Sequence, residues 1–183
     1  MIQQKLEIML QDTKQIRIET ERLVLRRMGL EDAPFILKLL NTEGWLKYIG
    51  DRNVKTEQAA ENYLREKVLV GSSMNGLGML LVEAKSEGKA IGICGLVERE
   101  GLDAPDIGFA FLPEHNGKGY AYESALPVLK FAKVELSLAK VQAITIKENL
   151  PSIRLLEKLG MAFIKTIRIP NDEEELLLYQ IQF

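Results

Sequence analysis

The sequence predicts a single mixed α/β domain over residues 1–183. With 46% hydrophobic residues, a chain of 183 residues can bury one sizeable core but is too short for two average domains and a linker. Apolar residues recur at three- and four-residue steps in some segments, as in helices, and gather in short runs between turn residues in others, as in strands. In chain order these segments predict β-α-α-β-β-β-α-β-α-β-β, a mixed central sheet of about seven strands flanked by about four helices.

The first half of the chain contains one strand and two helices in this prediction. RLVLRRM (22–28) is a β-rich apolar stretch and predicts the first strand. EDAPFILKLLN (31–41) predicts a helix, because acidic residues suit its positively polarised start and Pro34 is tolerated in a first turn. A polar segment follows, and Thr56 can then cap a second helix that extends to the region of Val70.

The second half predicts a three-stranded meander, a strand–helix–strand unit and a final pair of strands. The helix from Tyr120 to about Leu136 should join two parallel strands by a right-handed crossover. Pro127 lies inside it, lacks an N–H group and should kink it. A second helix should end at Gly160. The predicted strands lie at 77–84, 89–99, 106–112, 140–147, 162–169 and 175–183, and the second helix at 151–160.

Composition excludes several classes of protein. A net charge of −2 and a pI near 5.6 give no positive field that would gather nucleic acid. The only cysteine, Cys94, excludes an intrachain disulfide framework and favours a reducing, cytoplasmic location. The only histidine, His115, leaves metal sites and histidine-dependent nucleophile sites short of ligands.

The N-terminal segment gives no sign of a membrane partner. It lacks the pattern of a signal peptide, and no run in the chain approaches the roughly 20 apolar residues that span a bilayer. Apolar residues at helical spacing within 1–15 predict a short amphipathic extension that packs on the body or on a second subunit.

The segment HNGKGYAYESA (115–125) can form either an anion-binding loop or only a tight turn that starts a helix. It follows a predicted strand and opens a predicted helix, so its amides and the first free N–H groups of the helix would point to one place, which suits an anion. Gly117 and Gly119 can adopt backbone angles closed to other residues, and Lys118 adds positive charge. A Walker loop is excluded, because Leu112 stands where its first glycine would lie.

Three motifs resemble the GNAT superfamily of N-acetyltransferases, in particular its RimJ/RimL-like branch of ribosomal-protein N-terminal acetyltransferases. The pyrophosphate-binding pattern Gln/Arg-x-x-Gly-x-Gly/Ala is present as Asn116-Gly117-Lys118-Gly119-Tyr120-Ala121. TERLVLRRMGLEDAPFILKLL (20–40) and ENLPSIRLLEKLGM (148–161) flank it in the order and spacing of that branch, and together the resemblance covers 16–183. The chain departs from the pattern at Asn116, where the branch has a longer side chain, and at Met161, where it usually has Phe.

The resemblance implies a GNAT fold and acetyl-CoA as the cosubstrate. In that fold the strand before the loop and the strand after the helix splay apart, and the pantetheine arm lies in the gap like an extra strand. Applied to this chain, residues 116–121 would hold the pyrophosphate, and the main chain of Phe111 and Leu112 would contact the cofactor. The amine would attack directly in a ternary complex, without an acyl-enzyme.

The resemblance also implies roles for Asn149 and Ser152. Asn149-x-x-Ser152 matches the pattern of the branch, in which the hydroxyl supplies a proton to the departing sulfur and the Asn positions the pantetheine. Residue physics alone favours a simpler interpretation, in which Asn149 caps the next helix and Ser152 only lies in its first turn. The two roles can coexist.

The general base has two main candidates. Glu98 ends one predicted strand and Asp106 begins the next, so both can approach a cleft through water. Glu114 and His115, just before the loop, are weaker candidates. Carboxylates at strand ends are usually only solvated charges, and an amine that arrives partly deprotonated needs no dedicated base.

Aromatic and acidic clusters suggest where an acceptor could bind. Trp45 and Tyr48 lie between the first two helices, in a region that walls the acceptor site in this superfamily, although aromatic residues there are as often a local core. NDEEE (171–175) predicts a solvated hairpin loop, with attraction of a cationic acceptor as the alternative.

Together these observations predict an acetyl-CoA-dependent N-acetyltransferase that modifies a primary amine, on a protein N-terminus or a small molecule. We expect a monomer or homodimer, with no metal and no nucleic acid. The alternative is a non-catalytic acyl-CoA-binding sensor or interaction module, which the shorter side chain of Asn116 favours.

Overall fold

The protein is built around one eight-stranded sheet with the strand order β1-β2-β3-β4-β5-β6-β8-β7. The computed structural model describes residues 16–69, 78–170 and 174–183, so the helix expected within 1–15 and the tip of the acidic hairpin lie outside the described residues. The strands are β1 Arg17–Glu19, β2 Leu23–Arg26, β3 Gly78–Ala84, β4 Lys89–Val97, β5 Asp106–Phe111, β6 Lys140–Thr145, β7 Ala162–Ile167 and β8 Leu176–Gln182. The α-helices are α2 Ala33–Leu40, α3 Glu43–Tyr48, α4 Glu57–Tyr63, α5 Tyr120–Val134 and α6 Leu150–Lys158.

Two of these elements were not expected from the sequence. β1 pairs with β2 as a short hairpin, and its three residues are too few to show a periodic pattern. α3 occupies the segment expected to be polar coil, and that prediction was wrong. The Thr42 side chain caps α3 by accepting a hydrogen bond from the N–H of Trp45 at 3.3 Å, and Trp45 is buried. Tertiary packing of one large aromatic residue therefore sustains a helix that has no periodic signal.

Other local signals were confirmed. Thr56 accepts a hydrogen bond from the N–H of Ala59 at 3.1 Å and caps α4, which continues as a π-helical turn over 64–69. The end of α6 is marked by Gly160, which has a φ of 83°. Two main-chain hydrogen bonds, one nested inside the other, close the last turn of the helix. α5 runs through Pro127 from Tyr120 to Val134, and the kink there stays a prediction.

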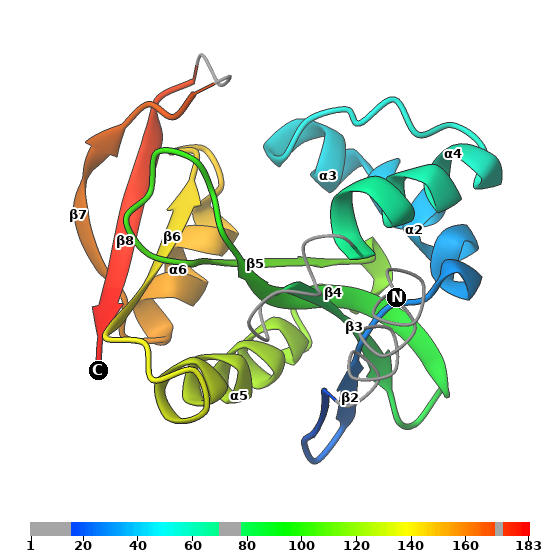
Figure 1. Cartoon of the computed structure of the whole chain (residues 1–183), viewed down its shortest axis with the longest axis horizontal. Helices are drawn as coiled ribbons and strands as arrows, with labels where there is room; N and C mark the ends of the chain where they lie inside the picture. The colour runs from blue at the N-terminus through cyan, green and yellow to red at the C-terminus, as the bar shows by residue number, and fades with distance from the viewer. Residues whose placement is uncertain (1–15, 70–77, 171–173) are drawn as a thin grey trace, which may run out of the picture.

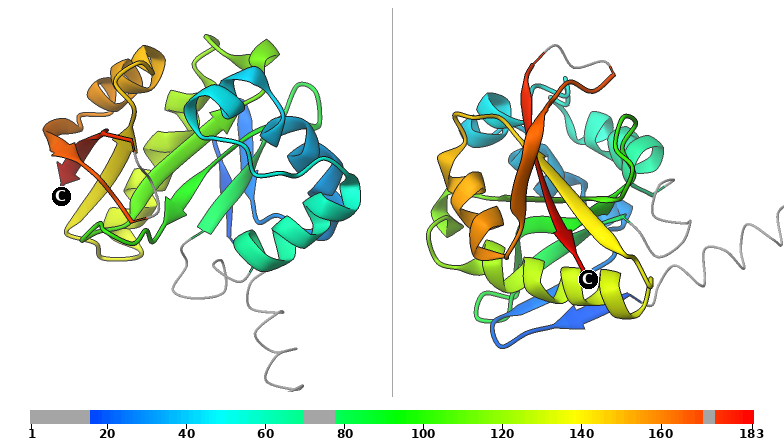
Figure 2. Two further views of the ribbon diagram at one scale, coloured as in Figure 1. Left: turned by 90° about the horizontal axis from the view of Figure 1, so that it is seen from above. Right: turned by 90° about the vertical axis from the view of Figure 1, so that its left-hand side faces the viewer.

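Helices cover both faces of the sheet and enclose two apolar layers. Figure 1 shows α5 on one side of β3–β5 and α2, α3 and α4 on the other. The alternation of β3 assigns its side chains to these layers, since Leu80 and Val82 pack with the α5 layer and Leu81 with the α2–α4 layer. The views in Figure 2 show α6 against the β6–β8 end of the sheet. Across the described residues, no helix combines the length and apolar character needed to cross a bilayer.

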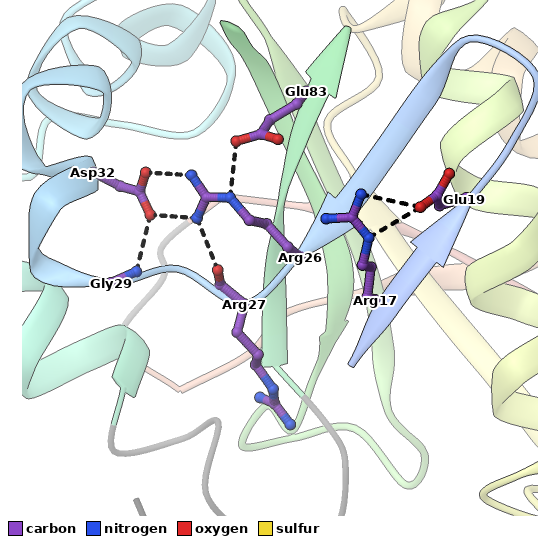
Figure 3. Close-up of polar contacts among 7 residues, drawn as sticks. All are labelled: Arg17, Glu19, Arg26, Arg27, Gly29, Asp32 and Glu83. Atoms are coloured by element: carbon purple, nitrogen blue, oxygen red, sulfur yellow. Dashed lines mark hydrogen bonds and ion pairs between the residues drawn. The ribbon is translucent and has the colours of Figure 1, made fainter. Parts of the chain in front are cut away.

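A buried ion pair connects β2 to the first helix. Arg26 donates two hydrogen bonds of 2.8 Å to the Asp32 carboxylate and one of 2.8 Å to Glu83, as Figure 3 shows. Asp32 also accepts the N–H of Gly29 at 2.9 Å and is only 7% exposed. The acidic residue expected to favour the helix start thus acts mainly as a bidentate partner of an arginine.

The sheet splits between β5 and β6. β3, β4 and β5 form the expected antiparallel meander, with β4 and β5 in register along their length. β5 and β6 are parallel, as predicted, but share a single register pair, Asp106 with Gln142, where the Gln142 N–H donates to the Pro105 carbonyl at 2.9 Å. Beyond that pair the two strands diverge (Figure 1), which is the splay that the resemblance to the GNAT superfamily implies. The split leaves backbone groups of β5 without a strand to bond.

Candidate active site

A cavity of about 310 Å³ opens at the split between β5 and β6. Three parts of the fold contribute to its wall: the α3–α4 layer through Trp45 and Tyr48, the middle of β5, and the start of α6 through Asn149 and Ser152. The sequence motifs at 148–161 and the aromatic residues near 45 are therefore brought to one chamber, although about a hundred residues separate them. Trp45 belongs both to the local core and to the cavity wall, whereas the half-buried Tyr48 lines the wall without being part of the core.

The loop before α5 has the geometry of an anion cradle. Gly117 and Gly119 have φ values of 72° and 82°, in the left-handed region that favours glycine. The first helical hydrogen bond runs from the N–H of Glu123 to the Gly119 carbonyl at 3.0 Å, and within the described part of the chain the N–H groups of 117–122 have no hydrogen-bond partner. Any helix start leaves its first N–H groups free, and this loop adds those of Gly117 and Lys118. The segment is therefore a helix start that also has the geometry expected of an anion-binding loop.

The β1–β2 turn holds this cradle from outside. Arg22 donates to the Lys118 carbonyl at 3.1 Å and stacks over the Tyr120 ring at 4.7 Å. It also pairs with Glu123 at 2.6 Å, and Thr20 donates to the same carboxylate at 2.6 Å. Burial raises the pKa of Glu123, but these hydrogen bonds outweigh it and leave the pKa below its usual value. Sequence reasoning missed this contact, because the motif at 20–40 says nothing about what its side chains touch.

The main chain of β5 faces the split at Phe111 but not at Leu112. The N–H of Leu112 donates to Ile91 in β4 at 2.9 Å, and its carbonyl accepts the N–H of His115 at 2.9 Å. Both main-chain groups of Leu112 are thus engaged within the protein, and the contact with a cofactor expected of that residue stays a prediction. Because alternate residues of a strand direct their N–H and C=O groups to opposite sides, those of Phe111 point away from β4, toward the split.

Asn149 and Ser152 lie where the sequence places them. The Asn149 side chain accepts the N–H of Ser152 at 3.2 Å and caps α6, so the capping interpretation is confirmed. Both residues line the cavity and are half-buried. Among the described residues the Ser152 hydroxyl has no hydrogen-bond partner, so it can donate a hydrogen bond into the cavity.

Asp106 is the carboxylate that reaches the cavity. It is 2% exposed and lies at the fork of β5 and β6. One carboxylate oxygen accepts hydrogen bonds of 2.9 Å from Arg99, while the other is buried with no partner in the described structure. Burial raises the pKa of Asp106 to about 6, and Arg99 and the main chain of Ile144 oppose this rise. A buried carboxylate with one free oxygen and a pKa near neutrality is suited to accept a proton.

The other expected bases do not reach the cavity. Glu98 is exposed, and only its neighbours Val97 and Arg99 line the wall, because alternate residues at a strand end point to opposite sides. The catalytic role expected of Glu98 stays a prediction, without support from the geometry of the cavity. Glu114 pairs with Lys38 at 2.7 Å outside the cavity. His115 is buried beside Tyr120, likewise outside it.

The comparison with known proteins settles the family. A family model described as an acetyltransferase (GNAT) domain matches residues 22–162. The chain belongs to the GNAT acetyltransferase family. It is thus an acetyl-CoA-dependent N-acetyltransferase with a GNAT fold, as the sequence motifs predict.

Relatives are similar over most of their length. An uncharacterized protein of Bacillus subtilis, YkkB, is 32% identical over 158 residues, covering 83% of this chain and 88% of its own. The solved GNAT acetyltransferase of Bacillus anthracis is 26% identical with a TM-score of 0.75, over 91% of this chain and 98% of its own. A ribosomal-protein-S5-alanine acetyltransferase from Vibrio fischeri has a TM-score of 0.77 at 20% identity, over 91% of this chain and 96% of its own, and so shares the fold.

Proposed function

We propose that this acetyltransferase transfers the acetyl group to a primary amine by direct attack in a ternary complex. The observation that carries the proposal is the single register pair between β5 and β6, because the resulting split opens into a cavity that the α3–α4 layer also lines. One chamber can therefore hold a thioester from the split and an amine from the helical side. Both a protein N-terminal α-amine and a small-molecule amine fit this proposal.

The residues present suit acetyl-CoA. The free N–H groups of 117–122 would bind its pyrophosphate, with Asn116 and Lys118 at the rim. The free main-chain groups of Phe111 would pair with the amides of the pantetheine arm along the split. The short side chain of Asn116 removes one potential donor, and the stacking of Arg22 on Tyr120 places a guanidinium beside the same loop.

The chain supplies both proton transfers of the reaction. Asp106 would take the proton that the amine loses as its nitrogen bonds to the thioester carbon, directly or through a water molecule. Ser152 would supply the proton that the sulfur gains as the carbon–sulfur bond breaks, and would recover a proton from solvent. Acetyl-CoA supplies the activated acetyl carbon.

An acyl-enzyme is disfavoured by the state of the only thiol. Cys94 is completely buried, and burial raises its pKa to about 12. It is therefore a poor nucleophile at neutral pH, which supports direct transfer. A cytoplasmic location and a monomeric or homodimeric state belong to the same proposal.

The test is turnover of acetyl-CoA with a panel of amines, followed by release of free thiol and by acetylated product. The panel contains peptides with varied N-terminal residues, amino acids, polyamines and aminoglycosides. The proposal predicts saturable, amine-dependent thiol release. Thermal stabilisation by acetyl-CoA without turnover of any amine would contradict it and favour an acyl-CoA sensor.

A further inference from the structure

The helical wall of the cavity carries hydrogen-bond donors that bond to nothing in the described part of the protein. Trp45, Tyr48, Arg52 and Tyr63 line this wall. The indole N–H of Trp45 is buried without a partner, and the half-buried Tyr48 and Tyr63 and the exposed guanidinium of Arg52 also have no hydrogen-bond partner among the described residues. Unpaired donors at a cavity wall favour a ligand that brings acceptor atoms.

The charged side chains of the cavity also favour a ligand that brings acceptor atoms. Arg52, Arg99 and Asp106 are the charged side chains that line it, within the described residues. Asp106 is paired with Arg99 at 2.9 Å, so the guanidinium of Arg52 is the charge left over. Its chain neighbour Asp51 does not neutralise it, since Asp51 pairs with Lys55 at 3.0 Å.

Neighbouring groups keep this end of the cavity positive. Lys47 lies over the ring of Tyr48, with its ammonium 5.0 Å from the ring centre. Arg52 lies close enough to Tyr63 to oppose the rise that burial causes in the pKa of that phenol. The rest of the wall is mostly apolar, with Met28, Ile36 and Leu40 among its residues. The site thus combines an apolar lining with a cation that has no acidic partner in the described ranges.

We infer that the acceptor is a monoamine that carries a carboxylate and an apolar side chain, as an apolar α-amino acid does. The inference rests on the proposed function and names the substrate class of the same site. A guanidinium binds a carboxylate through two parallel hydrogen bonds, which would fix the acceptor while its amine is directed to the Asp106 side. A polyamine would bring a second ammonium group to a cavity where, among the described residues, Arg52 has no acidic partner and the one lining carboxylate, Asp106, is already paired with Arg99; it is therefore selected against.

Matched acceptors test this inference. Phenylalanine, its amide, phenethylamine and spermidine are compared by kcat/KM with saturating acetyl-CoA. We expect phenylalanine to exceed its amide and phenethylamine by about tenfold or more, because a charged hydrogen bond is lost in the analogues. Spermidine should be the poorest acceptor.

Variants connect the preference to Arg52. R52Q should raise the KM for phenylalanine about tenfold while changing that for phenethylamine by less than about threefold, since only the carboxylate contact is removed. R65Q is the matched control, because Arg65 is an exposed arginine of the same helical layer that does not line the cavity. It should leave both acceptors unchanged.

Binding gives a readout independent of turnover. Trp45 is the only tryptophan and lines the cavity, so its fluorescence should respond when phenylalanine is titrated into the CoA-loaded protein. If phenylalanine binds in a way that depends on Arg52 but no amine is acetylated, the carboxylate-binding site is supported and the proposed function is overturned. Spermidine or phenethylamine acetylated as well as phenylalanine, with R52Q unaltered, would overturn the inference and leave the proposed function standing. Failure of phenylalanine to bind or react would also overturn the inference.

Discussion

Asp106 is expected to lower the stability of the protein at the pH at which it serves as a base. The difference between its ordinary pKa of 3.8 and its raised pKa of about 6, at about 1.4 kcal/mol for each pKa unit, corresponds to about 3 kcal/mol against the ionised carboxylate in the folded state. D106N keeps the shape and removes the charge. At pH 7 it should therefore be more stable than the wild type by about 3 kcal/mol, or roughly 6–12 °C in Tm.

The pH dependence follows from the direction of the shift. Well below its ordinary pKa of 3.8 the carboxyl group of Asp106 is protonated in both folded and unfolded states, so there the two proteins should be equally stable. Between about pH 4 and pH 6 the folded wild type binds more protons than the unfolded chain, so its stability falls as pH rises relative to D106N. Above that window the full difference persists. Urea unfolding from pH 4 to pH 8 measures this difference directly.

D106N should gain stability but lose catalytic activity. In the wild type, kcat/KM should rise with pH through about 6, as the base ionises, and D106N should lose about a hundredfold or more and the inflection with it. D103N is the control, because Asp103 is exposed, pairs with Lys140 on the surface, and should affect neither property strongly. A D106N protein that is less stable than the wild type at pH 7, or that keeps the wild-type pH profile of activity, would refute this account of Asp106.

Three further substitutions test the cradle, the proton donor and the ion pair. G119V should weaken CoA binding by about tenfold or more, because valine strains a φ of 82° in the cradle. The control G88V, at a φ of 60° in an open turn, should affect stability alone. If calorimetry shows that the G119V and G88V variants bind CoA equally well, the cradle is contradicted. S152A should lower kcat by about tenfold to a thousandfold with the Kd for CoA unchanged, and an equal loss of CoA binding would undo the assignment of the donor. R26M should lower the free energy of unfolding by about 3 kcal/mol, since it leaves Asp32 buried without its arginine partner. A change below about 0.5 kcal/mol, measured by urea unfolding, would show that the ion pair is dispensable.

Local patterns predicted most of the fold. Periodic apolar residues located α5 and α6, the turn residues between apolar runs located the β3–β5 meander, and Gly160 marked the end of α6. What escaped prediction depends on few residues or on distant partners. β1 has three residues, and α3 is held by one buried tryptophan, neither of which produces a period.

The site was only partly predictable for the same reason. The glycines of the cradle and the Asn149–Ser152 pair are visible because each is a short local motif. That Asp106 lines the cavity and Glu98 does not could be seen only in the fold, because the strand geometry decides which of two nearby carboxylates reaches the cavity. Arg22 and Arg52 act through partners or space that no local pattern encodes.

The most direct test of the central claim, one chamber for both donor and acceptor, is the intact mass of the protein during the reaction. After incubation with acetyl-CoA alone, the account predicts a protein of unchanged mass and no released thiol. Addition of an accepted amine should then release one thiol for each acetylated product. A protein that gains an acetyl group from acetyl-CoA alone and passes it to the amine would contradict direct transfer.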